Sequence, residues 1–162
     1  MTGRERIQIL TSISNPHGTR SKPDFEDLIR SLTGQNVDFI VVCAYALAVH
    51  GIPRYTQDLD LWMRRSAENA RRIQMAMSDF GLPISDADTD QLLAEREFLR
   101  FGYPPSRIEI LNFLDGCDFD TAFARAKHEQ LAGIDVAVLG LGDCVAAKRA
   151  SGRPKDLSDL YF

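Results

Sequence analysis

The chain has 162 residues, of which 44% are hydrophobic and 26% are charged, a length and composition typical of one globular domain with its own core. Its formal net charge of −4 and isoelectric point near 5.3 argue against a general affinity for the nucleic-acid backbone. The three cysteines, Cys43, Cys117 and Cys144, are widely spaced, which favours free thiols in a reducing cytoplasm over disulfides or a zinc site. No apolar run reaches membrane-spanning length and no signal-peptide pattern opens the chain, so we expect a cytoplasmic protein.

The first 23 residues differ in character from the rest. They are polar and contain helix-breaking residues at Asn15-Pro16 and Lys22-Pro23. We expect residues 1–23 to form an N-terminal arm. Two alternatives stay open for it: a short docking element built on residues such as Ile7 and Ile13, or a mobile arm. Residues 24–162 are expected to form the domain.

Hydrophobic periodicity and turn residues predict helices and strands that alternate along this domain. We expect helices at 24–34, 44–50, 66–80, 119–127 and 141–150, and a last helical turn from 155. An acidic loop at 85–90 is expected to lead into a short helix that ends near 97. We expect strands at 37–42, 98–101, 107–113 and 134–139, and an extended segment through 58–63. This alternation predicts an α/β (α+β) class with a mixed sheet and helices packed on it.

The most informative stretch is residues 37–63, where a strand and an alanine-rich helix lead into the segment with Asp58 and Asp60. Arg54, Thr56, Asp58 and Asp60 occupy every second position, so in a strand they share one face. Leu59, Leu61 and Met63 would then point into the core. Two carboxylates on one strand face repel each other, and a bound divalent cation is a natural reason to place them together. Taken alone, a D-x-D pair is more often a solvated strand end.

The spacing of several residues in this stretch is similar to that of a known family. His50, Gly51, Arg54, Thr56, Asp58 and Asp60, with Leu59 and Leu61, match a H-G-x-x-R-x-T-x-D-L-D-L run, and residues 152–160 match a G-R-x-K-D-x-x-D-L ending. The chain therefore resembles the nucleotidyltransferase superfamily with the DNA polymerase β-like fold, and within it the AbiEii-type and related bacterial proteins. The resemblance covers most of the chain from about residue 24 and implies a nucleotidyltransferase-like mixed sheet flanked by helices.

The resemblance also implies a site and a reaction. Asp58 and Asp60 would bind Mg²⁺, or Mn²⁺, and Glu109 on a neighbouring strand is the candidate third ligand or, alternatively, a general base. The reaction would transfer a nucleotide from a nucleoside triphosphate to a hydroxyl on RNA, a protein or a small molecule. The residues expected to bind the nucleotide and its phosphates are Cys43, Ala44, Arg54, Thr56, Lys148, Arg153 and Lys155.

Two positions depart from the family pattern. Cys43 and Ala44 stand where the family usually has glycine, which lets the backbone approach phosphate closely, and Glu109 stands in place of the usual aspartate. A second hypothesis is therefore a catalytically weak or inactive descendant that binds a partner protein, for instance the cognate toxin or antitoxin of a toxin–antitoxin pair. For His50 we favour a structural role at the end of a helix, and for Arg54 an ion pair and a phosphate contact are equally good interpretations.

Overall fold

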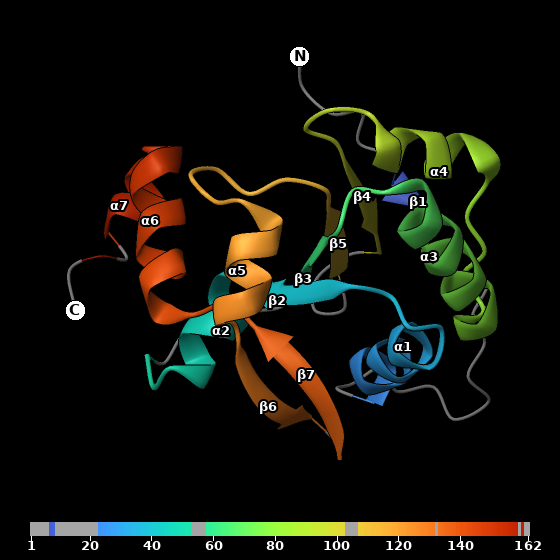
Figure 1. Cartoon of the computed structure of the whole chain (residues 1–162), viewed down its shortest axis with the longest axis horizontal. Coiled ribbons are helices and arrows are strands. Elements are labelled where there is room, and N and C mark those ends of the chain that lie inside the picture. The colour runs from blue at the N-terminus through green and yellow to red at the C-terminus, as the bar shows by residue number, and fades with distance from the viewer. Residues whose placement is uncertain are drawn as a thin grey trace.

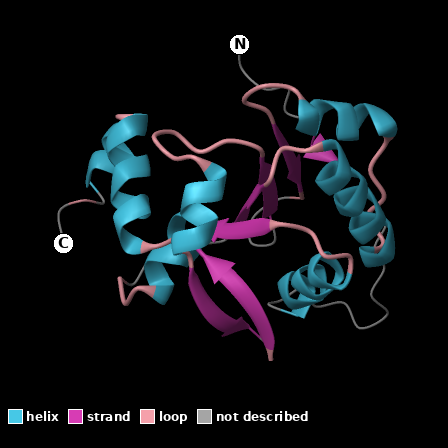
Figure 2. Cartoon of the chain, in the orientation of Figure 1, coloured by secondary structure: helices cyan, strands magenta, loops and turns pink. Residues whose placement is uncertain are grey.

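The computed structural model describes residues 7–8, 23–52, 58–102, 107–131, 133–158 and 160. Helices and strands alternate along these ranges (Figures 1 and 2). The helices are α1 (Pro23–Gly34), α2 (Cys43–Val49), α3 (Ala67–Phe80), α4 (Asp86–Leu93), α5 (Phe119–Arg125), α6 (Leu141–Ser151) and α7 (Pro154–Ser158). The strands are β1 (Ile7–Gln8), β2 (Phe39–Val42), β3 (Asp58–Met63), β4 (Phe98–Phe101), β5 (Arg107–Leu111), β6 (Lys127–Leu131) and β7 (Ile134–Val138).

The strands form one mixed sheet of seven strands in the order β1-β4-β5-β3-β2-β7-β6. The central strand β3 runs parallel to β5 and antiparallel to β2. β2 is parallel to β7, and the pairs β4–β5 and β6–β7 are antiparallel. The segment with Asp58 and Asp60 is thus the middle of the sheet, with a paired neighbour on each side, and the predicted fold class is confirmed.

In Figure 1 one group of helices, α1, α3 and α4, lies at one side of the view and another group, α2, α6 and α7, at the other, with α5 and the strands between them. In one group α1 packs on α3 and α3 packs on α4; in the other, α2 packs on α6 and α6 packs on α7. Among the described residues, no helix is long and apolar enough to cross a membrane.

Alternation along the central strands places the core as the sequence predicts. Leu59 and Leu61 are at most 1% exposed, and Ile108 and Ile110 on β5 are buried with them. Because successive side chains of a strand point to opposite faces, the charged residues between them must all face the other side. The alternation of side chains therefore gives these strands one buried apolar face and one charged face.

Helix α3 begins and ends as its sequence predicts. The Ser66 side chain accepts a hydrogen bond from the backbone N–H of Asn69, which satisfies one of the unpaired donors of the first turn. Gly81 ends the helix in the left-handed conformation, with φ of 92°, where glycine carries no Cβ penalty. Ile73 and Met77 lie on its buried face.

Several predicted elements need correction. The strand predicted at 107–113 ends at Leu111. Residues 86–90 are the first turns of α4 and not an acidic loop, and α4 ends at Leu93 instead of near 97. The physical reason is a capping box, in which Ser85 and Asp88 each accept from the other's backbone N–H. The helix predicted at 119–127 ends at Arg125, and the next residues form β6, a strand that the sequence analysis did not predict.

In the predicted N-terminal arm, Ile7 and Gln8 form β1 and pair in parallel with Arg100 and Phe101 of β4. The other residues before Pro23 lie outside the described residues, so the proposed docking or mobility of the arm stays a prediction.

Candidate functional site

Strand register brings the predicted acidic residues together on one face of the sheet. Asp60 of β3 is the direct partner of Glu109 on β5, and Asp58 is the direct partner of Arg107. Glu109 in turn is opposite Arg100 on β4. Directly opposite residues point to the same face, so the three carboxylates and two arginines form one charged surface over the middle of the sheet.

Two of the three acids are held by arginines. Arg107 donates to Asp58 with both Nε and Nη2, at 3.0 and 2.6 Å. Arg100 donates from Nε and Nη2 to one oxygen of Glu109, at 3.2 and 3.0 Å. All four side chains are between 18% and 30% exposed, so these ion pairs are shielded more than surface pairs are. The arginines offset most of the negative charge on this face.

Asp60 has a different environment. Burial, together with the charges of Glu109 and Asp58, raises the pKa of Asp60 from 3.8 to about 7. The thiol of Cys43 donates a hydrogen bond to this carboxyl and Arg107 lies near it, and both effects oppose the rise. The surroundings of Asp60 therefore disfavour its ionised form.

Cys43 has a backbone that glycine would adopt more easily. It is the first residue of α2 and has φ of 62°, in the left-handed region where a Cβ is disfavoured. Its half-buried side chain contacts the core, and burial together with Asp60 raises the pKa of the thiol well above its usual value. The thiol is thus protonated at neutral pH and acts as a hydrogen-bond donor to Asp60 and not as a nucleophile.

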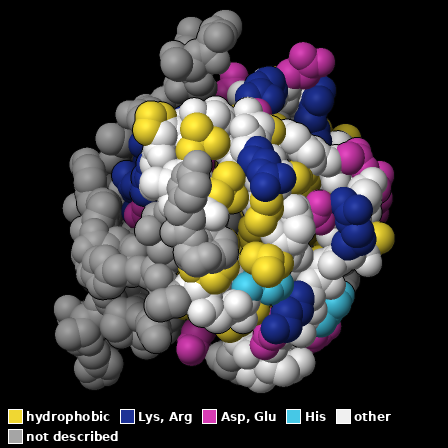
Figure 3. All heavy atoms as spheres, turned by 90° about the vertical axis from the view of Figure 1, so that its left-hand side faces the viewer, with side chains coloured by type: hydrophobic (Ala, Val, Ile, Leu, Met, Phe, Trp, Pro, Cys, Tyr) yellow, Lys and Arg dark blue, Asp and Glu magenta, His cyan; other side chains and the backbone are white. Residues whose placement is uncertain are grey.

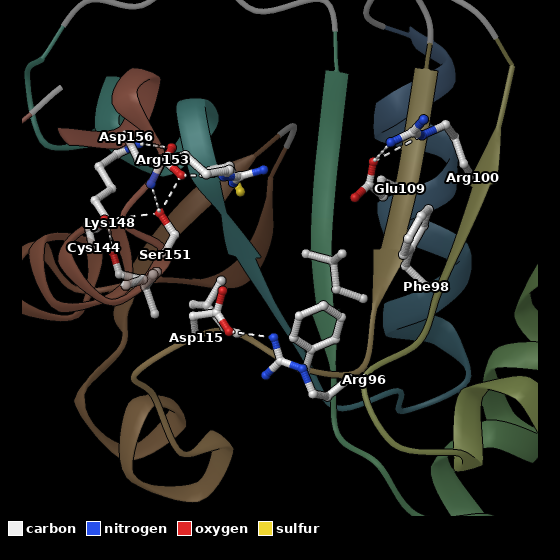
Figure 4. Close-up of a pocket in the computed structure, with 16 residues that line it drawn as sticks. Arg96, Phe98, Arg100, Glu109, Asp115, Cys144, Lys148, Ser151, Arg153 and Asp156 are labelled. Carbon is white, nitrogen blue, oxygen red and sulfur yellow. Dashed lines mark hydrogen bonds and ion pairs between the residues drawn. The ribbon is translucent and has the colours of Figure 1, made fainter. Parts of the chain in front are cut away.

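A pocket of about 390 Å³ lies between the sheet and the α6–α7 end of the molecule. Figure 4 shows its two walls: Glu109 and Arg100 on the sheet side, and Lys148 and Arg153 on the helix side. Cys43 also lines the pocket. One wall of the pocket therefore carries Glu109, one of the three carboxylates on the charged face of the sheet, and the opposite wall carries the cations Lys148 and Arg153.

Asp156 holds the cations of the helix wall in place. Its Oδ2 accepts from Arg153 Nε at 2.7 Å and from Ser151 Oγ at 2.6 Å, and Lys148 Nζ lies 3.5 Å from its Oδ1. Asp156 is only 8% exposed. Although burial opposes ionisation, the hydrogen bonds from Ser151 and Arg153 outweigh it and lower the pKa of Asp156. The G-R-x-K-D segment is thus folded around this one carboxylate, with Gly152 at φ of 64° where α6 ends.

The other predicted site residues are distributed differently. Ala44 lies in the first turn of α2, and Lys155 is exposed on α7 and is not part of the pocket lining. Arg54 and Thr56 lie outside the described residues. His50 Nε2 is 2.7 Å from the carbonyl oxygen of Leu139. This contact supports the structural role favoured for this histidine, because it connects the end of α2 to the residue that follows β7.

Four site residues escaped the sequence analysis: Arg96, Arg100, Arg107 and Asp115. Arg100 and Arg107 alternate with apolar residues in their strands exactly as Glu109 does, and that alternation is the signal that places them on the charged face. Arg96 and Asp115 lie in loops and meet at 2.7 Å, a contact for which the sequence has no local signal.

The donor chemistry of the acid group suits a hard divalent cation. Mg²⁺ prefers carboxylate oxygens. Burial and the neighbouring charges of Glu109 and Asp58 raise the pKa of Asp60, and a bound cation would relieve the repulsion among these carboxylates. Across the described ranges, however, no group of three or more His, Cys, Asp and Glu side chains lies close enough to hold a metal ion. A metal bound by Asp58, Asp60 and Glu109 stays a prediction. Such an ion would compete with Arg107, which contacts both oxygens of Asp58, whereas Arg100 contacts one oxygen of Glu109.

Comparison with known proteins bears on the fold. No protein-family model matches the chain, and no curated protein matches it in sequence. Among solved structures, the chain is similar to the crystal structure of a protein from Thermotoga maritima described as a putative nucleotidyltransferase. The TM-score is 0.54 at 18% sequence identity, over 89% of this chain and 94% of that chain. At this identity the similarity concerns the fold. The mixed sheet flanked by helices is a nucleotidyltransferase-like fold, as the sequence predicts.

Proposed function

We propose that the protein is a metal-dependent nucleotidyltransferase that moves a nucleoside monophosphate from a nucleoside triphosphate to a hydroxyl on RNA, a protein or a small molecule. The observation that carries this proposal is the pocket, in which Glu109 from the acid-bearing face lies opposite Lys148 and Arg153. The similarity of the fold to a protein described as a nucleotidyltransferase supports it. We also propose a cytoplasmic location, in keeping with three free cysteines.

Each group of side chains has a distinct part in this proposal. Lys148 and Arg153 would bind phosphate oxygens, and their contacts with Asp156 set their positions before the nucleotide arrives. Asp58, Asp60 and Glu109 would hold Mg²⁺ or Mn²⁺. When bound, such an ion neutralises triphosphate charge and lowers the pKa of an acceptor hydroxyl. In the alternative role, Glu109 accepts the proton of that hydroxyl as a general base.

Calorimetric titration tests the proposal. ATP, CTP, GTP and UTP, each with Mg²⁺, are titrated into the wild-type protein and into the double variant Asp58→Asn/Asp60→Asn. We expect at least one nucleotide to bind the wild type and to lose at least about tenfold in affinity in the double variant, because the metal ligands are gone. Asp90→Asn, at an exposed position on α4, is the matched control and should leave binding unchanged. Absence of binding by all four nucleotides to the folded wild type would refute the proposal.

A second function is favoured by the arginine pairs and by Cys43. Asp58 and Glu109 are already partnered by arginines, and the Cys43 side chain stands at a position with glycine-like backbone. Both features suit an inactive AbiEii-type protein that binds a toxin or antitoxin. Figure 3 shows hydrophobic side chains among charged ones on the face at the α6–α7 end. Leu141 and Leu157 are 42% and 40% exposed there, so a partner surface would centre on these two helices.

A further inference from the structure

The two ends of the pocket differ in chemistry. One end has the charged groups Arg100, Glu109, Lys148, Arg153 and Asp156. Phe98 pairs with Leu111 two residues along the strands from the Arg100–Glu109 pair, so the apolar and aromatic lining residues, Phe98, Leu111, Phe113 and Leu114, lie toward the other end, with Arg96 and Asp115. In Figure 4, the Arg96–Asp115 pair lies across the space between the two walls, at the end away from Arg153 and Lys148. The lining therefore suits a ligand that is charged and polar in one part and flat or apolar in another.

Both rings of the aromatic end have an arginine over them. The guanidinium carbon of Arg96 is 4.4 Å from the centroid of the Phe113 ring, and that of Arg100 is 5.4 Å from the Phe98 ring. The two rings are only half-buried, although they line the pocket. Phenylalanine rings and guanidinium planes are the two kinds of protein surface on which nucleic-acid bases stack.

We propose that Phe98, Phe113 and Arg96 form a nucleobase subsite, so that the bound nucleotide lies with its base at the aromatic end and its phosphates toward Lys148 and Arg153. This inference rests on the proposed function and adds the orientation of the nucleotide. A pocket of about 390 Å³ lies within the usual size range of small-molecule sites, roughly 300–1,000 Å³.

The Arg96–Asp115 pair gives this end of the pocket polar groups as well as rings. Arg96 is 62% exposed and its Nη2 donates to Asp115 Oδ1 at 2.7 Å. A guanidinium supplies N–H donors and a carboxylate supplies acceptors, and the Watson–Crick edge of every base carries both kinds of partner. An aliphatic acceptor substrate would neither pair with these polar groups nor stack on the rings and guanidinium groups, so we assign this end of the pocket to the base.

The experiment compares whole nucleotides with a ligand that has phosphates and no base. ATP, CTP, GTP, UTP and inorganic tripolyphosphate, each with Mg²⁺, are titrated calorimetrically into wild type, Phe113→Ala and Phe113→Leu. We expect Phe113→Ala to weaken binding of the preferred nucleotide by about 5- to 150-fold, the worth of one base–aromatic stack. Phe113→Leu, which preserves more apolar volume, should fall between wild type and Phe113→Ala. Neither variant should change the affinity for tripolyphosphate.

Phe123→Ala is the matched control. Phe123 is also half-buried and lies beneath an arginine, with Arg64 at 5.7 Å from its ring centroid, but it is outside the pocket lining. It should leave both affinities at the wild-type value. If Phe113→Ala leaves nucleotide binding unchanged, or weakens nucleotide and tripolyphosphate equally, the base subsite is wrong while the proposed function stands. If the wild type binds none of the four nucleotides, both proposals are refuted.

Discussion

Charge on the central strands is balanced side chain by side chain. Arg107 neutralises Asp58 and Arg100 neutralises Glu109, through pairs whose members are all less than one-third exposed. Asp60 lies between these pairs and is hydrogen-bonded by the neutral thiol of Cys43. Removing one partner of a shielded pair leaves an uncompensated charge, which costs more than the pair itself contributes. Among the described residues Asp60 has no arginine ion pair of its own, and its raised pKa makes its protonation sensitive to pH near neutrality.

The raised pKa of Asp60 predicts a specific dependence of stability on pH. Because the folded protein binds this proton up to about pH 7 while the unfolded chain releases it near its ordinary value of about 3.9, the free energy of unfolding falls as pH rises between these values. In Asp60→Asn the side chain stays neutral, so this fall should be absent and the variant should be more stable than wild type at pH 8. The difference is on the order of 1–4 kcal/mol, at about 1.4 kcal/mol per pKa unit.

Urea unfolding at pH 5, 6, 7 and 8 measures this effect. Asp90→Asn, which changes an exposed aspartate on α4, should keep the wild-type slope and is the control. The raised pKa of Asp60 would be contradicted if the free energy of unfolding of the wild type rises between pH 5 and pH 8 and that of Asp60→Asn changes with pH in the same way.

Gly116 lies unusually close to helix α6. Gly116 has φ of 72°, and a Cβ built on it would lie 2.7 Å from the Cβ of Ala150 and 3.1 Å from the carbonyl oxygen of Ala146. Ala146 and Ala150 are on either side of Lys148 in the sequence, so this contact sets the distance between the loop after β5 and the helix that carries the phosphate-binding cation. Only a residue without a side chain permits that spacing.

Substitution of Gly116 should therefore affect both stability and the pocket. In Gly116→Ala the left-handed backbone costs about 1–2 kcal/mol and the clash with α6 adds about 1–3 kcal/mol. We expect a lower free energy of unfolding and, because α6 moves outward, weaker nucleotide binding.

Gly133→Ala is the matched control for Gly116→Ala. Gly133 has φ of 79° and nothing within 4 Å of an added Cβ, so its substitution carries the backbone cost without the clash. Gly133→Ala should lower the free energy of unfolding by about 1–2 kcal/mol and leave the affinity for the nucleotide unchanged. Equal losses in both variants, measured by urea unfolding and calorimetry, would show that α6 does not depend on this contact.

A single sheet passes through the whole described structure, and one core is packed on it. β2, next to the central strand, contributes Phe39, Ile40, Val41 and Val42 to that core, and Ile40 is completely buried. Trp62, the chain's only tryptophan, is 2% exposed on β3 and meets Phe119 edge to face at 5.1 Å. A shared core of this kind predicts that the domain unfolds as one cooperative unit.

Unfolding followed by two probes tests this cooperativity. Trp62 fluorescence and far-UV circular dichroism should give coincident urea transitions in the wild type and in Ile40→Ala. Ile40→Ala should lower the free energy of unfolding by about 2–5 kcal/mol, because it leaves a cavity beneath β2. Met75→Ala, at a side chain that is 52% exposed on α3, should change stability by less than about 0.5 kcal/mol. Separate transitions for the two probes would instead indicate two independently folding parts.

Local patterns in the sequence were sufficient for most of the elements. Ser66 and Gly81 delimit α3 because caps act within one turn of the helix, and the alternation around Asp60 and Glu109 assigns each side chain to a face because the strand period is two. The exceptions also had local causes: the Ser85–Asp88 box starts α4 inside the acidic run, and β6 is a charged edge strand, Lys127–Leu131, with little apolar alternation.

The order of the elements along the chain does not show which strands become neighbours in the sheet. Glu109 was expected near Asp60 only through the family resemblance; their direct pairing, and the arginines that hold Asp58 and Glu109, arise from the register of β3, β4 and β5. The pocket likewise needs α6 and α7 to fold back over that face and loop residues Arg96 and Asp115 to meet. The sequence by itself determined the elements and the faces on which their charges lie, because both depend on periods of a few residues. Tertiary structure alone decided which charges neutralise one another, because ion pairs between distant segments depend on strand order and register.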